Sequence, residues 1–104
     1  MASLQSVQII VAQIVSLVNP TRIILFGSSA RGTTGPDSDL DILVVMPDGT
    51  HRRKTAQLLY KSVRRNGIPL DFVVATEDDL IRHKDDFWTV ICPALQEGKV
   101  LYAA

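Results

Sequence analysis

The stretch from Gly27 to Val45 constrains the fold of this chain more than any other part of the sequence. It reads GSSARGTTGPDSDLDILVV, so a loop rich in Gly and Ser leads into a short apolar run typical of a buried strand. The acids Asp39 and Asp41 lie at the start of that strand. Side chains two residues apart on a strand point to the same face, so we expect Asp39 and Asp41 to project together.

Two carboxylates held side by side repel each other, and they stay together at low cost only when one protonates or a cation lies between them. Mg²⁺ suits such an all-oxygen site, since it typically binds one or two carboxylates together with substrate phosphates. Upstream, Gly27 and Ser28 follow the apolar segment 23–26. A strand should end there, where backbone N–H groups can face a phosphate chain. The residues alone therefore indicate magnesium and a phosphorylated substrate.

Other interpretations of the acidic stretch are weaker. An Asp-rich turn before a strand needs no ion, because Asp and Ser are ordinary turn residues, and this alternative stays open. An EF-hand loop starting at Asp37 would need Gly at its sixth position, where the chain has Ile42. A Walker phosphate loop over residues 27–32 would need Lys next, where Thr33 stands. Both of these motifs fail at the residue on which their geometry depends.

The spacing resembles the nucleotidyltransferase superfamily that includes DNA polymerase beta, and most closely its minimal prokaryotic members. The family pattern is an apolar strand, Gly-Ser, a spacer, and Asp-x-Asp before further apolar residues. Here Gly27-Ser28 and Asp39-Leu40-Asp41 are separated by residues 29 to 38. Many minimal members read Gly-Ser-x-Ala-Arg-Gly, as residues 27–32 do. The resemblance extends to the closing residues 97–102, which are similar to the family's final strand.

This resemblance implies a third carboxylate on a later strand, and Asp71 stands where that residue is expected. The catalytic and metal-binding residues would then be three acids: Asp39, Asp41 and Asp71. By the same analogy they would hold two Mg²⁺ ions, with Asp71 on the side of the acceptor, where it would also help to take up a proton. Gly27 and Ser28 would bind the β and γ phosphates, and Arg31 could offer a bidentate fork to a phosphate or lie in solvent.

The implied activity is magnesium-dependent transfer of AMP from ATP to a hydroxyl group. Minimal members often pair with a separately encoded helical HEPN protein, as the antitoxin half of a toxin-antitoxin system that modifies a tyrosine of the toxin. We therefore expect a protein adenylyltransferase antitoxin with a HEPN toxin as its partner. Two alternatives stay open. One is a binding module that neutralises or scaffolds its partner by contact, and the other is a small-molecule nucleotidyltransferase whose pocket is completed by another domain or a dimer.

Size and charge narrow the choice of partner. The 104 residues are expected to form one domain, residues 1–104, and a homo-oligomer is left open. With 11 Lys+Arg against 11 Asp+Glu, the chain lacks the excess positive charge of an autonomous nucleic-acid binder, so a long nucleic acid is not favoured. Its single cysteine, Cys92, suits a reducing cytoplasm. The amino-terminal segment has no basic region and contains several glutamines, so we expect neither a signal peptide nor a membrane span.

The order of apolar patterns predicts an α/β (α+β) domain with a small central mixed sheet and helices packed against it. Helices are expected at 3–18, from a Thr50 cap to Asn66-Gly67, at 77–84 and at 85–96, and strands at 22–26, 40–45, 69–75 and 100–102. Thr76, followed three residues later by Asp79, resembles a capping box. The first helix has a broad apolar face, which either is buried or meets another protein. The basic residues of the second helix form either a solvated face or a basic surface for phosphate or a partner.

Overall fold

The computed structural model describes residues 4–26, 40–64, 67, 69–83 and 98–104. Within these residues the elements follow in the order α1 (Leu4–Val18), β1 (Arg22–Phe26), β2 (Leu40–Met46), α3 (Arg52–Ser62), β3 (Leu70–Thr76), α4 (Glu77–His83) and β4 (Lys99–Ala103). No helix in this part of the chain is both long and apolar enough to cross a membrane. The helix expected at 85–96 and Cys92 lie outside the described residues.

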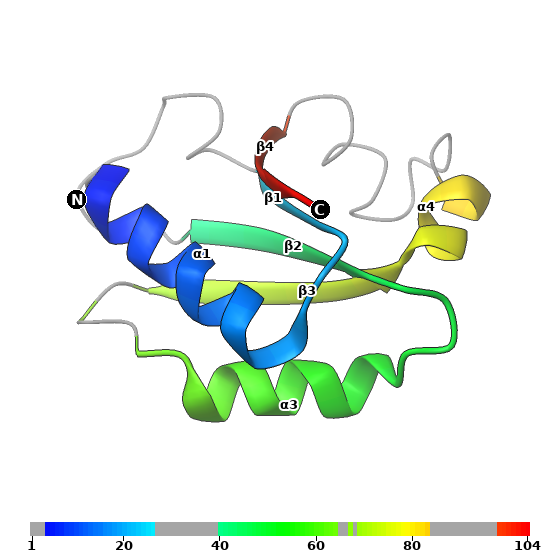
Figure 1. The fold of residues 1–104 in the computed structure, drawn as a ribbon, viewed down its shortest axis with the longest axis horizontal. Coiled ribbons are helices and arrows are strands. Elements are labelled where there is room, and N and C mark those ends of the chain that lie inside the picture. Colours follow the sequence, from blue (N-terminus) through cyan, green and yellow to red (C-terminus); the bar gives the residue numbers. More distant parts are fainter. Residues whose placement is uncertain (1–3, 27–39, 65–66, 68, 84–97) are drawn as a thin grey trace.

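The four strands form one sheet in the order β3-β2-β1-β4 (Figure 1). β2 and β3 are parallel, while β1 is antiparallel to both β2 and β4. The sheet is therefore mixed, and the predicted α+β architecture is confirmed. β3 and β4 are its outer strands.

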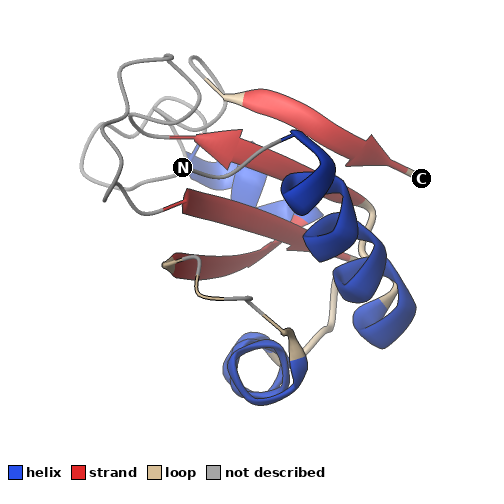
Figure 2. Cartoon of the chain, turned by 90° about the vertical axis from the view of Figure 1, so that its left-hand side faces the viewer, coloured by secondary structure: helices blue, strands red, loops and turns tan. Residues whose placement is uncertain are grey.

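The two faces of the sheet have separate apolar cores, because side chains alternate along each strand. One core joins even-numbered residues of β2, among them Ile42 and Val44, to the inner faces of α1 and α3. The other joins Leu43 and Val45 to Leu80 of α4. Figure 2 shows that α1 packs on the sheet, while α3 lies at the edge formed by β3. Both helices contribute to the same core. One face therefore carries α1 and α3, and the opposite face carries α4.

The first helix ends where the sequence predicts. Asn19 has a positive φ of 50°, and its N–H donates to the carbonyl oxygen of Val15 at 3.1 Å. Asn is one of the few residues that adopt this left-handed conformation readily, and Pro20 cannot continue a helix. α1 is two-sided, since Ile10 and Ile14 are buried while Ile9 and Leu17 are 47% and 37% exposed.

The boundaries predicted for the second helix are wrong at both ends. His51, not Thr50, caps α3, and its Nδ1 accepts a hydrogen bond from the Lys54 N–H at 3.1 Å. The Thr50 hydroxyl instead donates to the Pro47 carbonyl at 2.7 Å, within the preceding turn. The helix stops at Ser62, before Asn66-Gly67, because Val63 takes an extended conformation and is buried in the core.

The start of α4 is the capping box that the sequence predicts. The Thr76 N–H donates to Asp79 Oδ2 at 3.0 Å, and the Asp79 N–H donates to the Thr76 hydroxyl at 3.2 Å. These two bonds satisfy donors that a helix terminus otherwise leaves without a partner. β3 can therefore pass directly into α4 without a loop.

Candidate active site

Asp41 and Asp71 lie directly beside each other across the parallel strands β2 and β3. Neighbouring strands lie about 4.8 Å apart, and residues in register point to the same face of the sheet. Each acid is the second residue of its strand, so both stand at the end of the sheet where β2 and β3 begin. The structure thus brings together two of the three acids predicted for the site.

The alternation of apolar residues fixes the direction in which these acids point. Leu40 and Ile42 on either side of Asp41 are buried, and so are Leu70 and Phe72 on either side of Asp71. Because these neighbours fill the core under α1 and α3, the acids must point to the other face. There Asp41 is half-buried and Asp71 is exposed, so the site can be reached from solvent.

The remaining predicted site residues lie outside the described part of the chain: Asp39, Gly27, Ser28 and Arg31. Among the described residues, no group of three or more His, Cys, Asp or Glu gathers closely enough to hold a metal ion. Asp41 and Asp71 nevertheless provide the hard oxygen ligands that Mg²⁺ prefers, and Mg²⁺ commonly uses one or two carboxylates. The donor chemistry of this pair therefore fits magnesium.

Two further acids lie at the opposite end of the sheet, and both contact arginines. Glu77 accepts hydrogen bonds from the Thr21 hydroxyl at 2.7 Å and from Arg22 Nη2 at 2.8 Å. The bond from Thr21, followed by that from Arg22, outweighs partial burial and lowers the pKa of Glu77. These contacts bind the start of β1 to the start of α4.

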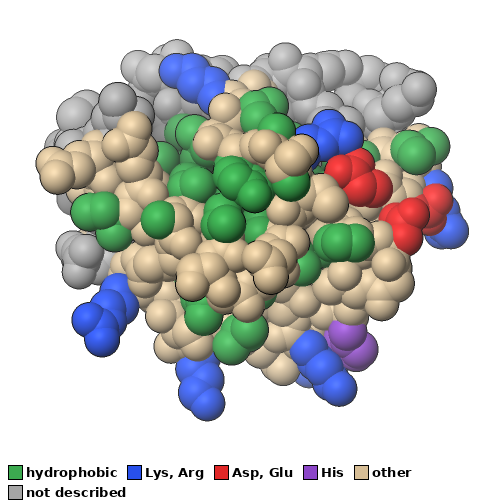
Figure 3. All heavy atoms as spheres, viewed as in Figure 1, with side chains coloured by type: hydrophobic (Ala, Val, Ile, Leu, Met, Phe, Trp, Pro, Cys, Tyr) green, Lys and Arg blue, Asp and Glu red, His purple; other side chains and the backbone are tan. Residues whose placement is uncertain are grey.

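Asp79 is the most buried of the described acids. Its burial acts to raise the pKa, but hydrogen bonds from the Thr76 N–H and hydroxyl, with the charge of Arg52, outweigh burial and lower the pKa. Arg52 Nη1 lies 2.9 Å from Asp79 Oδ2 and joins the first turn of α3 to α4. In Figure 3, acidic side chains gather near α4 with basic side chains beside them, and further basic side chains lie along the edge formed by α3.

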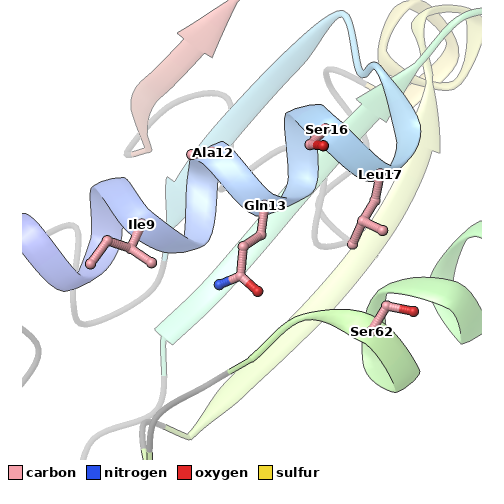
Figure 4. Close-up of a pocket in the computed structure, with 6 residues that line it drawn as sticks. All are labelled: Ile9, Ala12, Gln13, Ser16, Leu17 and Ser62. Carbon is pink, nitrogen blue, oxygen red and sulfur yellow. The ribbon is translucent and has the colours of Figure 1, made fainter.

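A groove of about 450 Å³ lies between α1 and α3 (Figure 4). Its lining consists of Ile9, Ala12, Gln13, Ser16, Leu17 and Ser62, and none of these carries a charge. The groove lies on the face of the sheet that carries α1 and α3, whereas Asp41 and Asp71 point to the opposite face. It therefore cannot present a bound molecule to the two acids.

The mixed sheet with acids paired at the start of its parallel strands defines a protein of the nucleotidyl-transfer class. The chain belongs to the nucleotidyltransferase domain family, whose family model matches residues 7–100. A Methanocaldococcus jannaschii protein that is provisionally named a protein adenylyltransferase is 35% identical over 81 residues. The match covers 78% of this chain and 77% of the relative.

Solved structures with the same fold include a provisionally named nucleotidyltransferase from Sulfolobus solfataricus, with a TM-score of 0.66 and 22% identity over 95% of this chain and 78% of that one. A toxin-antitoxin structure with AMP-PNP has a TM-score of 0.58 and 25% identity, and the match covers 97% of this chain and 75% of the other. A complex of tri-AMPylated Shewanella oneidensis HEPN toxin with an MNT antitoxin has a TM-score of 0.51 and 24% identity over 97% of this chain and 74% of that one.

Proposed function

We propose that this protein transfers AMP from ATP to a hydroxyl of a partner protein, a tyrosine of a HEPN-type toxin, and so acts as an antitoxin. The observation that carries the proposal is the register of Asp41 against Asp71. The provisional name of the M. jannaschii relative supports an adenylyl group and a protein acceptor. The S. oneidensis complex of an AMPylated HEPN toxin with its antitoxin supports the choice of partner.

In the proposed reaction the acceptor oxygen forms a bond to the α phosphorus of ATP, and the bond from that phosphorus to the bridging oxygen breaks. Pyrophosphate leaves, and Asp71 helps to take up the proton of the acceptor hydroxyl. Asp41 and Asp71, together with Asp39, would hold Mg²⁺, which when bound neutralises the triphosphate and acidifies the hydroxyl. Gly27 and Ser28 would bind the β and γ phosphates, with Arg31 as a further phosphate ligand.

The groove between α1 and α3 does not serve as the acceptor site in this proposal. Its volume is within the range of small-molecule pockets, but it lies on the side of the sheet away from Asp41 and Asp71. A macromolecular acceptor can instead bring its own surface to the exposed end of β3. We place the reaction in the cytoplasm, where ATP and Mg²⁺ are supplied.

The test is to incubate the purified protein with each labelled nucleoside triphosphate, Mg²⁺ and its cognate toxin, and to locate the label by mass spectrometry. We expect AMP on a tyrosine of the toxin. The variant carrying both Asp39→Asn and Asp41→Asn should lose labelling and neutralisation together. Asp78→Asn is the matched control, because it makes the same chemical change at the opposite end of the sheet and should label normally.

The same variants separate catalysis from neutralisation by contact. If the double variant still neutralises the toxin at equal protein concentration while transferring no label, the protein is a binding module. If label reaches a small molecule and never the toxin, the proposed acceptor is wrong.

A further inference from the structure

β3 is an outer strand of the sheet, yet on its outer side the backbone of Phe72 forms hydrogen bonds. The Phe72 N–H donates to the Tyr60 phenol oxygen at 3.0 Å, and the phenol lies 3.4 Å from the Phe72 carbonyl oxygen, to which it can donate. A phenol both donates and accepts, so it can satisfy the two groups that a further strand would otherwise satisfy. Tyr60 thus takes the place of a neighbouring strand at this position.

The ring of Tyr60 is also held in place. It packs edge to face on the ring of Phe72, with centroids 5.2 Å apart and planes at 73°. Phe72 is buried in the core under α1 and α3, so the contact fixes the phenol relative to the sheet. α3 is therefore joined to β3 by one residue that uses both its ring and its hydroxyl.

The bonded position immediately follows Asp71. Along a parallel strand the backbone groups of successive residues point alternately to the two sides, so those of Asp71 point inward to β2 when those of Phe72 point outward. The Pro69 carbonyl accepts a hydrogen bond from the Leu40 N–H at 3.0 Å and holds the start of the strand on the inner side. Without Tyr60, nothing described holds the outer side at this end.

We propose that Tyr60 is a positioning residue for Asp71. Its phenol prevents the start of β3 from fraying and keeps the carboxylate of Asp71 in register with Asp41. The inference rests on the proposed function, since it assumes that the two acids bind the metal ion. Metal affinity depends steeply on the placement of ligands, and changes to residues that orient ligands commonly cost tenfold to about a hundredfold.

The test compares Tyr60→Phe with Gln13→Met. Tyr60→Phe keeps the ring contact and removes only the hydroxyl. Gln13 also makes two hydrogen bonds to one backbone position, since its Oε1 accepts from the Arg64 N–H at 2.7 Å and its Nε2 donates to the Arg64 carbonyl at 3.1 Å. Its removal therefore matches the loss of bonds at a place away from the acids.

Three measurements are made on each folded variant. Amide hydrogen exchange at Asp71, whose backbone groups face β2, reports the fraying of β3. Titration with Mn²⁺ followed by electron paramagnetic resonance reports metal affinity, and labelled transfer reports kcat and KM for ATP. For Tyr60→Phe we expect faster exchange at Asp71, about tenfold weaker Mn²⁺ binding, a similar fall in kcat and an unchanged KM. For Gln13→Met, Mn²⁺ affinity and kcat should equal those of the parent protein.

Two results would overturn the inference. One is a Tyr60→Phe protein with parental Mn²⁺ affinity and kcat, and the other is an equal fall in both quantities for Gln13→Met. Asp71→Asn distinguishes this failure from failure of the proposed function. If Asp71→Asn abolishes transfer while Tyr60→Phe has no effect, only the positioning role is wrong. If Asp71→Asn changes neither Mn²⁺ binding nor transfer, the proposed role of the acids is wrong, and the positioning role is wrong with it.

Discussion

Acidic residues have different neighbours at the two ends of the central sheet. Where β2 and β3 begin, an acid lies beside an acid, Asp41 across from Asp71. Where β3 ends, each acid lies against an arginine, with 2.8 Å between Arg22 Nη2 and Glu77 Oε2 and 2.9 Å between Arg52 Nη1 and Asp79 Oδ2. The same residue types therefore occupy two different electrostatic settings within one small sheet.

We interpret the difference as a division between acids that hold the fold together and the acids that are proposed to bind a metal ion. At the α4 end the chain supplies both charges, and the pKa values of Glu77 and Asp79 are lowered because hydrogen bonds and arginines stabilise their charged forms. At the other end two carboxylates lie next to each other, and a bound cation would stabilise both charged forms. We infer that Glu77 and Asp79 stabilise the fold, and that Asp41 and Asp71 take part in the proposed reaction.

The largest expected effect is on catalysis, at the end where the acids are adjacent. Asp71→Asn should lower labelled transfer by roughly a thousandfold, because it removes several kcal/mol of transition-state stabilisation. The free energy of unfolding, measured with urea, should stay constant or rise by up to about 1 kcal/mol, since a like-charge neighbour is removed. A clear loss of stability in this variant would break the comparison, because Asp71 would then hold the fold as well.

The next largest effect is on stability, at the α4 end. Asp79→Ala should lower the free energy of unfolding by about 2 kcal/mol, because the Thr76 N–H and Arg52 both lose their acceptor. Asp78→Ala is the matched control, since the side chain of Asp78 is 44% exposed and pairs with Arg82 one turn later. It should cost less than about 0.5 kcal/mol. If the two variants lower the free energy of unfolding equally, the burial of Asp79 does not determine its contribution to stability.

Local signals allowed much of this fold to be predicted from the sequence. The end of α1 at Asn19-Pro20 and the capping box of Thr76 with Asp79 depend on residues a few positions apart, and both predictions are confirmed. The cap of α3 was missed, because the Thr50 hydroxyl is already bonded within the preceding turn and the His51 imidazole accepts the hydrogen bond from the helix instead. Its end was missed because burial of Val63 in the core overrides the Asn-Gly signal.

The candidate site, too, could be predicted from the sequence only in part. Apolar neighbours of Asp41 and Asp71 reveal which face of its strand each acid occupies, but not that the two strands are adjacent and in register. That expectation came from the family resemblance. The role of Tyr60 could not be predicted, because its bonds to Phe72 depend on how closely α3 approaches β3. Asp39, Gly27, Ser28 and Arg31 remain predictions.

The smallest expected effect is a dependence of stability on pH that belongs to the α4 end. Because the pKa of Glu77 is lower in the folded chain than its ordinary value of 4.5, the unfolded chain binds more protons as the pH falls through this range. Stability from Glu77 is thus complete above about pH 4.5 and is lost as the pH falls through the folded pKa. The lowered pKa of Asp79 acts in the same direction, below its ordinary value of 3.8.

The loss of unfolding free energy with falling pH is the acid limb of the stability curve. Glu77→Gln should make part of this limb less steep when urea unfolding is followed from pH 7 to pH 3. Its effect at neutral pH should stay below about 1 kcal/mol, because Arg22 is 41% exposed and solvent screens the pair. An acid limb of unchanged slope in Glu77→Gln would contradict the assignment of Glu77 to the fold. Since the Thr21 hydroxyl is the largest cause of the lowered pKa, Thr21→Val should flatten the limb more than Arg22→Met does. The reverse order would mean that the arginine charge, and not the hydrogen bond from the neighbouring hydroxyl, binds this acid to the sheet.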